Sequence, residues 1–286
     1  MQAIRSYLSL IKFSHTIFAM PFALIGFTLG VKWGLEPANY IRVFILVILC
    51  MVFARSAAMA FNRYLDKNFD ALNPRTAIRE IPSGIISANS ALLFTIVCSI
   101  LFMVCAYLLN PLCFYLSPVA LSVILGYSYT KRFTPLCHLI LGLGLSLAPI
   151  GAYLAVTAQF ALVPVLISVA VLLWVSGFDI IYALQDEEFD KTQGLHSIPA
   201  AVGKAKALRI SELLHLVCAL VLMYVYASGG FGWLYLAGWF IFITMLVYQH
   251  SLVKPNDLSK VNIAFMTANG IASIVFAVFV ILDIIF

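Results

Sequence analysis

Two short acidic stretches contain most of the side chains in this sequence that could carry out chemistry. They run from residue 62 to 70 and from 179 to 190, and they hold 7 of the chain's 12 acidic residues. At about 100° per residue of an α-helix, each stretch places its oxygen-bearing side chains on one face, roughly 80° wide in the first and roughly 40° wide in the second. These side chains are Asn62, Asp66 and Asp70, then Asp179, Asp186 and Asp190. Each stretch therefore predicts a stripe of oxygen ligands.

The two stripes predict a site for a divalent cation and a diphosphate. Carboxylate and amide oxygens without histidine or cysteine suit a hard ion such as Mg²⁺, which normally also binds phosphate oxygens of the substrate. Unpaired carboxylates repel one another and are costly beside a membrane, so a cation is expected between them. Nearby basic and hydroxyl side chains would bind the diphosphate and neutralise it as it leaves. These are Arg75, Arg79, Tyr127, Lys131 and Tyr182.

Composition predicts the elements that position these residues. The 286 residues are 63% hydrophobic and 10% charged, which excludes a soluble globule. Apolar runs of about 20 residues follow one another with short breaks, which predicts an all-α integral membrane protein rather than a β-barrel. We expect a single transmembrane domain over residues 1–286, with nine helices in one bundle. The predicted spans are 13–31, 41–61, 88–109, 112–129, 136–157, 162–182, 209–227, 231–250 and 262–284.

Lysine and arginine predict the orientation of this bundle. With the N-terminus in the cytoplasm, fourteen of them fall on that side and only Lys32 and Arg42 on the other, as the positive-inside rule requires. The C-terminus then lies outside the inner (plasma) membrane. Both acidic stretches fall on the cytoplasmic side, where they can face one another. One stretch alone could be a solvated anchor, but two beside basic loops favour a site. The similar segments 79–84 and 196–201 raise the possibility of duplicated halves.

Residues within the spans give further expectations. Arg55 lies seven positions before Asn62, inside a span where a charge is costly and usually functional. It could pair with an aspartate or bind the substrate directly. The scattered histidines are expected mostly at the surface or the membrane interface. The six cysteines lack metal spacing and are expected to be small buried side chains. Some aromatic rings could line a tunnel and stabilise a carbocation.

At these motifs the chain resembles the UbiA family of intramembrane prenyltransferases over nearly its whole length. Residues 62–70 are similar to the family's first motif, Asn-Asp-x-x-Asp-x-x-x-Asp, and residues 179–190 to its second. Tyr127-x-x-x-Lys131 is similar to the motif between them. The resemblance implies nine helices around a central cavity open to the cytoplasm. It also implies that the six oxygen ligands hold Mg²⁺ and diphosphate, that the basic residues contact the phosphates, and that Arg55 lies near an aromatic acceptor.

One position departs from the family's pattern. Arg63 stands where the first motif has its first aspartate. The pair Asn62-Arg63 and the stretch from Asn73 to Gly84 resemble the 4-hydroxybenzoate branch of the family and its relatives in the futalosine route to menaquinone. Because Arg63 replaces a potential ligand, we expect the second stretch to supply more of the metal binding.

The implied function is Mg²⁺-dependent transfer of a polyprenyl group in quinone biosynthesis. An allylic polyprenyl diphosphate would ionise, and the ring of a small aromatic acid, 4-hydroxybenzoate or a dihydroxynaphthoate, would attack the allyl cation without a covalent enzyme nucleophile. Asp66 or Asp186 could accept the ring proton. The partners are thus these two substrates and the lipid bilayer, with no nucleic acid. One alternative is prenyl transfer to a lipid acceptor. A second is a CDP-alcohol phosphotransferase, but its Asp-Gly-x-x-Ala-Arg signature is missing. A third is a cation-coupled transporter, which would place its acidic residues near the bilayer midplane.

Overall fold

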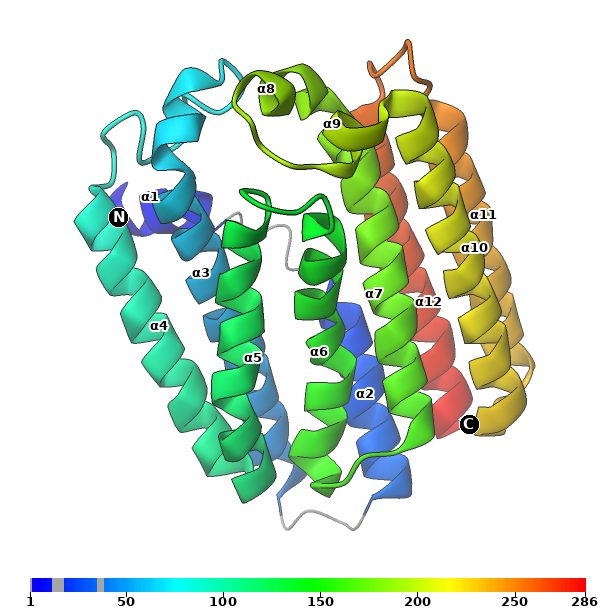
Figure 1. Cartoon of the computed structure of the whole chain (residues 1–286). Coiled ribbons are helices and arrows are strands. Elements are labelled where there is room, and N and C mark those ends of the chain that lie inside the picture. Colours follow the sequence, from blue (N-terminus) through cyan, green and yellow to red (C-terminus); the bar gives the residue numbers. More distant parts are fainter. Residues whose placement is uncertain (1, 12–17, 35–38) are drawn as a thin grey trace.

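The computed structural model describes residues 2–11, 18–34 and 39–286 and shows a bundle of helices (Figure 1). The described part of the chain contains no β-strand, so the prediction of an all-α membrane protein is confirmed. The elements are α1 (Gln2–Leu10), α2 (Met20–Trp33), α3 (Tyr40–Leu72), α4 (Ala88–Leu109), α5 (Pro111–Thr130), α6 (Cys137–Thr157), α7 (Leu162–Ala183), η2 (Leu184–Asp186), α8 (Glu187–Thr192), α9 (Ile198–Val202), α10 (Lys204–Gly229), α11 (Trp233–Leu252), η3 (Ile263–Ala268) and α12 (Asn269–Ile285).

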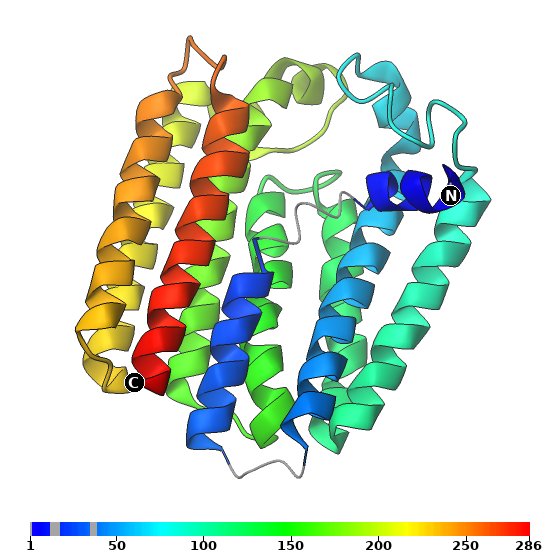
Figure 2. The same cartoon turned by 180° about the vertical axis from the view of Figure 1, so that it is seen from behind.

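Eight of the described helical segments are long and apolar enough to cross a membrane. They coincide with eight of the predicted spans. The predicted first span, 13–31, begins outside the described residues, as do Lys12 and His15, and its described helix, α2, has 14 residues. The count of nine spans therefore stays a prediction. The short helix α1 lies crosswise to the long helices (Figure 2).

The first acidic stretch continues a membrane-spanning helix without a break. The sequence predicts a span over 41–61, whereas α3 runs on to Leu72. Asn39 caps its start, because the Asn39 side chain accepts a hydrogen bond from the backbone N–H of Arg42 at 2.9 Å. The helix ends just before Asn73, since the residue before a proline avoids the α conformation. The ligand candidates of this stretch are therefore fixed on the last turns of one continuous helix.

The second acidic stretch is not one regular helix. α7 ends at Ala183, η2 forms a tighter 3₁₀ turn, and α8 resumes the α-helix. A 3₁₀ turn advances by roughly 120° per residue instead of roughly 100°. The predicted single stripe is therefore wrong in its geometry: Asp179, Asp186 and Asp190 lie on three successive elements.

The hydrophobic core surrounds α7 and thereby anchors the second acidic stretch. Trp174 on α7 is fully buried. Its indole packs against the rings of Phe22, Phe178 and Phe242, with centroids 5.0–5.7 Å apart. Rings at such distances and tilted angles pack favourably beyond the area that they bury. The helix that carries Asp179 is therefore held from several sides.

A π-helical turn, η3, precedes α12 and reaches the same region. Such a turn is wider than an α turn and leaves backbone carbonyls without their usual partners. The buried side chain of Asn269 meets this need: its Nδ2 donates to the carbonyl oxygens of Ala264 and Phe265 at 3.1 and 2.9 Å. Its Oδ1 accepts a hydrogen bond from the Trp174 indole at 2.9 Å. The turn places the Phe265 ring 4.2 Å from the ring of Tyr182.

Asp283 caps the start of α11 from the neighbouring helix α12. Its carboxylate accepts hydrogen bonds from the backbone N–H groups of Gly232 and Tyr235 at 2.7 and 3.2 Å, donors that a first helical turn leaves without a partner. Asp283→Ala is expected to lower the free energy of unfolding by about 0.5–2 kcal/mol, as measured by thermal unfolding in detergent. The site at the acidic stretches should stay unchanged, because the cap lies at the opposite end of the bundle from α8 (Figure 1). A loss of activity without a loss of stability would contradict this assignment.

The two basic side chains predicted on the far side of the membrane bind helix ends. Lys32 Nζ donates to the carbonyl oxygen of Ile284 at 2.6 Å, and Arg42 Nη2 donates to that of Leu108 at 3.3 Å. These carbonyls carry the partial negative charge of a helix C-terminus. Figure 1 shows the end of α12 at the opposite end of the bundle from α8 and α9. Which end faces the cytoplasm stays a prediction, as do the duplicated halves, since segment 79–84 forms turns where segment 196–201 enters α9.

Candidate active site

Asp66 lies near the end of α3 and makes three side-chain hydrogen bonds. It is 2% exposed. Its Oδ2 accepts from Lys131 Nζ at 2.5 Å and from Asn62 Nδ2 at 3.2 Å, and its Oδ1 accepts from Arg132 Nη2 at 3.1 Å. Lys131 and Arg132 lie between α5 and α6. Charge-assisted bonds of this kind hold a carboxylate in one position, so Asp66 joins α3 to the α5–α6 loop.

Asp70 lies one turn further along α3 and is also buried. Its Oδ1 accepts from Arg79 Nη1 at 2.7 Å. Its Oδ2 is buried without a hydrogen-bond partner in the described structure, an arrangement that is costly unless a ligand supplies the missing interaction. Arg63, the residue that departs from the family motif, is buried close enough for the charges of Asp70 and Glu80 to act on it.

Asp186 connects the second acidic stretch to the loop that follows the first. Arg75 Nε and Nη2 donate to its two carboxylate oxygens at 3.2 and 2.5 Å, a bidentate pair. Asn73 Nδ2 donates to the same carboxylate at 3.3 Å. Arg75 Nη1 also donates to the hydroxyl of Tyr182 at 3.1 Å, whose ring lies against Phe265. The structure thus connects the second acidic stretch to the loop that follows the first.

Asp179 lies near the end of α7 and pairs with a histidine. His138 Nδ1 is 2.7 Å from Asp179 Oδ2, and His138 is 3% exposed. The expectation that the histidines lie mostly at the surface is wrong for His138. It is also wrong for His215, which is buried and bonded to His250 at 2.9 Å. Buried polar rings need partners, and the spacing of residues along the sequence does not reveal them.

Tyr127, on the last turns of α5, lies where these groups converge. The charges of Asp66, Asp179 and Arg55 all act on its hydroxyl. Members of both acidic stretches therefore lie within electrostatic reach of a single side chain. Lys131, one turn further on, bonds to Asp66 as described above.

Asp190, in α8, completes the predicted set. The charges of Asp186 and Lys131 act on its carboxylate, which places it on the same side of the molecule as those two residues. Except for Arg55, which lies in the middle of α3, the site residues predicted from the sequence thus lie around the ends of α3, α5 and α7 and in the segments that follow them. Each is connected to at least one other by a bond or by a charge interaction.

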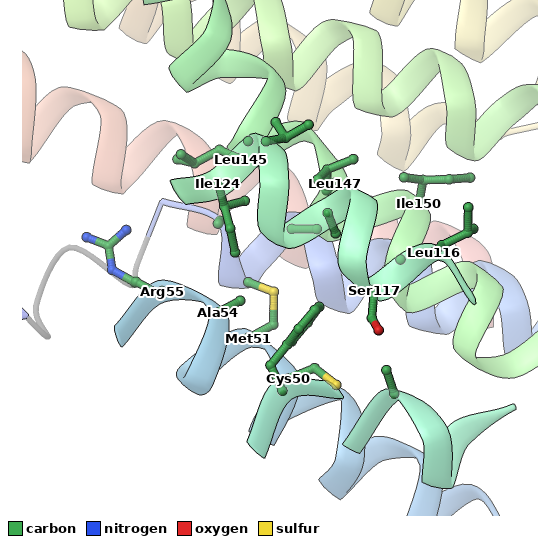
Figure 3. A pocket seen from close by; sticks show the side chains of 18 of the residues that line it. Cys50, Met51, Ala54, Arg55, Leu116, Ser117, Ile124, Leu145, Leu147 and Ile150 are labelled. Atoms are coloured by element: carbon green, nitrogen blue, oxygen red, sulfur yellow. The ribbon is translucent and has the colours of Figure 1, made fainter. Parts of the chain in front are cut away.

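An apolar cavity of about 360 Å³ adjoins this charged region. It lies between α3, α4, α5 and α6, and Figure 3 shows Met51 and Ala54 on one wall and Leu145 on another. Arg55 and Tyr127 line it together with apolar residues, and no described acidic side chain lines it. Its composition suits a hydrocarbon chain whose charged head would lie among the aspartates.

Arg55 stands at one end of this cavity (Figure 3). Its Nε is buried without a hydrogen-bond partner in the described structure. The described residues also form no ion pair with it, in contrast to Arg75 and Arg79, which bind aspartates. Of the two roles that the sequence leaves open for Arg55, the structure therefore favours direct contact with a substrate over pairing with an aspartate.

The cavity yields a prediction about chain length. Ser117 lies on α5 about 15 Å along the helix from Tyr127 and lines the cavity. Ser117→Phe is expected to weaken binding of an amphipathic phosphate ester with a long hydrocarbon chain by about tenfold while changing that of a short-chain one little, because one filled site removes about 1–3 kcal/mol of binding for the excluded groups. The measurement is the ratio of the two dissociation constants. Ser122→Phe, on the exposed face of the same helix, is the matched control, and an equal effect of both variants would contradict the prediction.

The donor atoms at this site fit a hard cation. All predicted ligands are carboxylate or amide oxygens, the preferred ligands of Mg²⁺, and Asp70 Oδ2 is a buried oxygen without a partner. The described residues contain no group of three histidine, cysteine, aspartate or glutamate side chains close enough to hold a metal ion by themselves. Mg²⁺ normally keeps water and substrate phosphate among its ligands. The residues therefore fit a metal that binds together with a diphosphate.

Three side chains join this site that the sequence did not single out. Arg132 binds Asp66, Asn73 binds Asp186 and His138 binds Asp179. Arg132 directly follows the predicted residue Lys131, and Asn73 lies two residues before the predicted residue Arg75. Their closeness to these residues in the sequence could have indicated both. His138 carries no such signal, because its partner is 41 positions away.

An apolar cavity that ends at Arg55 and Tyr127, next to paired aspartates and basic side chains, defines a class of protein. Such a site holds an amphipathic molecule within the membrane, with its hydrocarbon tail in the cavity and its anionic head among the charges. The chemistry of the aspartates and arginines is that of phosphate-bearing substrates.

Comparison with known proteins identifies the family. Residues 19–271 match the sequence model of the UbiA prenyltransferase family. The 4-hydroxybenzoate octaprenyltransferase of Aeromonas hydrophila subsp. hydrophila is 30% identical over 254 residues, 87% of each chain. That of Aliivibrio fischeri (strain MJ11) is 32% identical over 244 residues, 82% of each chain. The chain belongs to the UbiA prenyltransferase family, and it is a membrane-embedded prenyltransferase.

Solved structures agree with this assignment. A UbiA homolog from Aeropyrum pernix K1 superposes with a TM-score of 0.80 at 29% identity, covering 95% of this chain and 97% of that one. A UbiA homolog from Archaeoglobus fulgidus bound to DMAPP and Mg²⁺ superposes with a TM-score of 0.77 at 23% identity, covering 98% and 99%. The second likeness is evidence of the shared fold.

Proposed function

We propose that this protein transfers a polyprenyl group from an allylic polyprenyl diphosphate to the ring of a small aromatic acid, with Mg²⁺, in the inner membrane. The acceptor would be 4-hydroxybenzoate or a dihydroxynaphthoate in quinone biosynthesis. The single transmembrane domain over residues 1–286 would be the catalytic unit. The observation that carries the proposal is the apolar cavity that ends at Arg55 and Tyr127, beside two acidic stretches, the second of which is bound by Arg75 from the loop that follows the first.

One set of side chains would bind the metal, and another would bind the diphosphate. Mg²⁺ would be held by oxygen ligands from both stretches, and when bound it supplies positive charge that stabilises the leaving diphosphate. The ligands would be Asn62, Asp66, Asp70, Asp179, Asp186 and Asp190. Arg75, Arg79 and Lys131 would turn from their carboxylate partners toward the phosphate oxygens, and Tyr127 and Tyr182 would donate hydrogen bonds.

The cavity would separate the two substrates' reactive ends from water. The prenyl tail would lie along α3, α5 and α6, which positions its first carbon near Tyr127. Arg55, whose Nε lacks a partner, would bind the carboxylate of the aromatic acid. The ring would then attack the allylic carbon as its bond to the diphosphate breaks, and Asp66 or Asp186 would accept the ring proton. Holding both partners in line supplies much of the rate enhancement.

Purified protein in detergent tests the proposal directly. It is incubated with Mg²⁺ and a labelled polyprenyl diphosphate, and separately with 4-hydroxybenzoate and with 1,4-dihydroxy-6-naphthoate. Labelled prenylated product with one acceptor, lost when Mg²⁺ is chelated, is the expected result. No product with either acceptor would overturn the proposed acceptor class.

Two alternative functions make different predictions. A lipid acceptor would give product only when lipid is supplied. A cation-coupled transporter requires acidic residues near the bilayer midplane, whereas here Asp66, Asp186 and their partners lie at helix ends and in loops. That placement favours the enzyme over the transporter.

A further inference from the structure

Asp179 differs from the other paired aspartates of the site in the partner that it uses. Asp66, Asp70 and Asp186 are bound by lysine or arginine side chains. Asp179 is bound by His138, near the start of α6. Lysine and arginine lie on flexible side chains that can turn to a phosphate, whereas a buried histidine ring cannot do so without breaking its packing. The Asp179 bond is therefore a different kind of contact.

The His138 ring is held from both sides. A carboxylate only accepts hydrogen bonds, so Nδ1 donates to Asp179 Oδ2 across 2.7 Å. The backbone N–H of Ile198 donates to Nε2 at 3.3 Å, so Nε2 is the acceptor. The Ser176 hydroxyl donates to the His138 carbonyl oxygen at 3.1 Å. These bonds fix both the orientation of the ring and the nitrogen that carries its proton.

The same ring lies where two loops of the site meet. The backbone N–H of His196 donates to the Lys131 carbonyl oxygen at 2.6 Å, and the Cys137 thiol donates to the His196 carbonyl oxygen at 3.5 Å. Lys131 in turn binds Asp66. His138 thus connects the second acidic stretch to the start of α9, and it lies next to the segment that contacts the loop reaching the first stretch.

We propose that His138 is a positioning residue that fixes the Asp179 carboxylate toward Mg²⁺ and the diphosphate. This inference rests on the proposed function. Carboxylates that bind a metal are commonly oriented by such outer partners, whose removal lowers metal affinity or activity by about 10–100-fold. His138 acts through Asp179 and does not itself touch the substrate.

Two substitutions of His138 each remove one of the two hydrogen bonds that its ring nitrogens make. His138→Asn keeps a donor where Nδ1 lies and loses the acceptor for Ile198. His138→Gln keeps an acceptor where Nε2 lies and loses the donor to Asp179. Binding of Mg²⁺ with geranyl S-thiolodiphosphate, an analogue that ionises too slowly to react, is measured by isothermal titration, and the thermal midpoint is measured in parallel.

A crossed pattern is the expected result. His138→Gln should weaken binding of the Mg²⁺-analogue complex by about 10–100-fold with a small change in thermal midpoint, and His138→Asn should keep affinity within about 3-fold while lowering the midpoint. In an Asp179→Asn background, His138→Gln should add less than about 2-fold, because the two residues act as one unit. Equal weakening by both variants, or none by His138→Gln, would overturn the proposal.

Two further measurements keep this test independent of folding and of the proposed function. Asp179→Asn keeps an oxygen acceptor opposite His138 and removes the charge, so unchanged affinity in that variant would also overturn the proposal. Product formation by the unaltered protein tests the acceptor class. The analogue titration needs no acceptor, so it can succeed where the acceptor assay fails.

Discussion

Asp66→Ala is expected to lower the rate of prenyl transfer by about 10²–10³-fold, the range seen when a charge-stabilising group is removed from an active site. Asp66 binds Lys131, Arg132 and Asn62 at once. Its removal would take away a proposed metal ligand and leave two cations near the reacting centre without their partner. Both effects act on the leaving diphosphate, so kcat should fall more than KM rises.

The measurement is a steady-state assay on protein that elutes from size-exclusion chromatography as a single species. Asp66→Asn keeps the shape of the side chain and one acceptor oxygen but removes the charge. If it loses most of the activity as Asp66→Ala does, the loss comes from the missing charge and not from altered packing. Asp257→Ala removes an acidic side chain from an exposed loop and should change nothing. Substantial activity in Asp66→Ala would contradict the role of the first stretch.

Asp186→Ala is expected to cause a loss of similar size, at least about 10²-fold. Asp186 is bound by both nitrogens of the Arg75 fork and by Asn73, so its loss would release the loop that carries Arg75 as well as remove a ligand. Because Arg75 also binds Tyr182, we expect KM for the prenyl diphosphate to rise together with the fall in kcat.

Glu188→Ala is the matched control for this second stretch. Glu188 is exposed and lies two residues from Asp186 in the same acidic segment. The Glu188→Ala variant should keep its rate within about 2-fold of that of the unaltered protein, since surface substitutions away from such contacts have small effects. Equal losses in the two variants would mean that total negative charge, rather than the specific contacts of Asp186, determines activity.

The sequence predicts much of this molecule because its strongest signals are local. Apolar runs define spanning helices, and four-residue spacing placed Asn62, Asp66 and Asp70 on α3, where the structure has them. Orientation rules also put both stretches on one side, but the sequence assigned Arg75 to the diphosphate, and its bond to Asp186 comes from the structure.

What the sequence could not predict depends on contacts between distant segments. His138 is buried only because α6 packs against α7, and a histidine near a span boundary has the same local signature wherever it points. The 3₁₀ turn that separates Asp179 from Asp186 is likewise set by how the segment packs, since short 3₁₀ pieces have no strong pattern of their own. Arg132 binds Asp66 from 66 positions away, a distance over which periodicity says nothing.

The π-helical turn at Ile263–Ala268 has a consequence for insertions and deletions. Such a turn accommodates one residue more than an α turn, so deleting one residue there would let the chain close into a regular α-helix while α12 keeps its register. The same deletion in the middle of α3 would rotate Asp66 and Asp70 by roughly 100° away from their partners. Single-residue length variation is therefore tolerable for the bundle at the start of the last helix, at the expense of the Phe265 contact with Tyr182, and intolerable along α3.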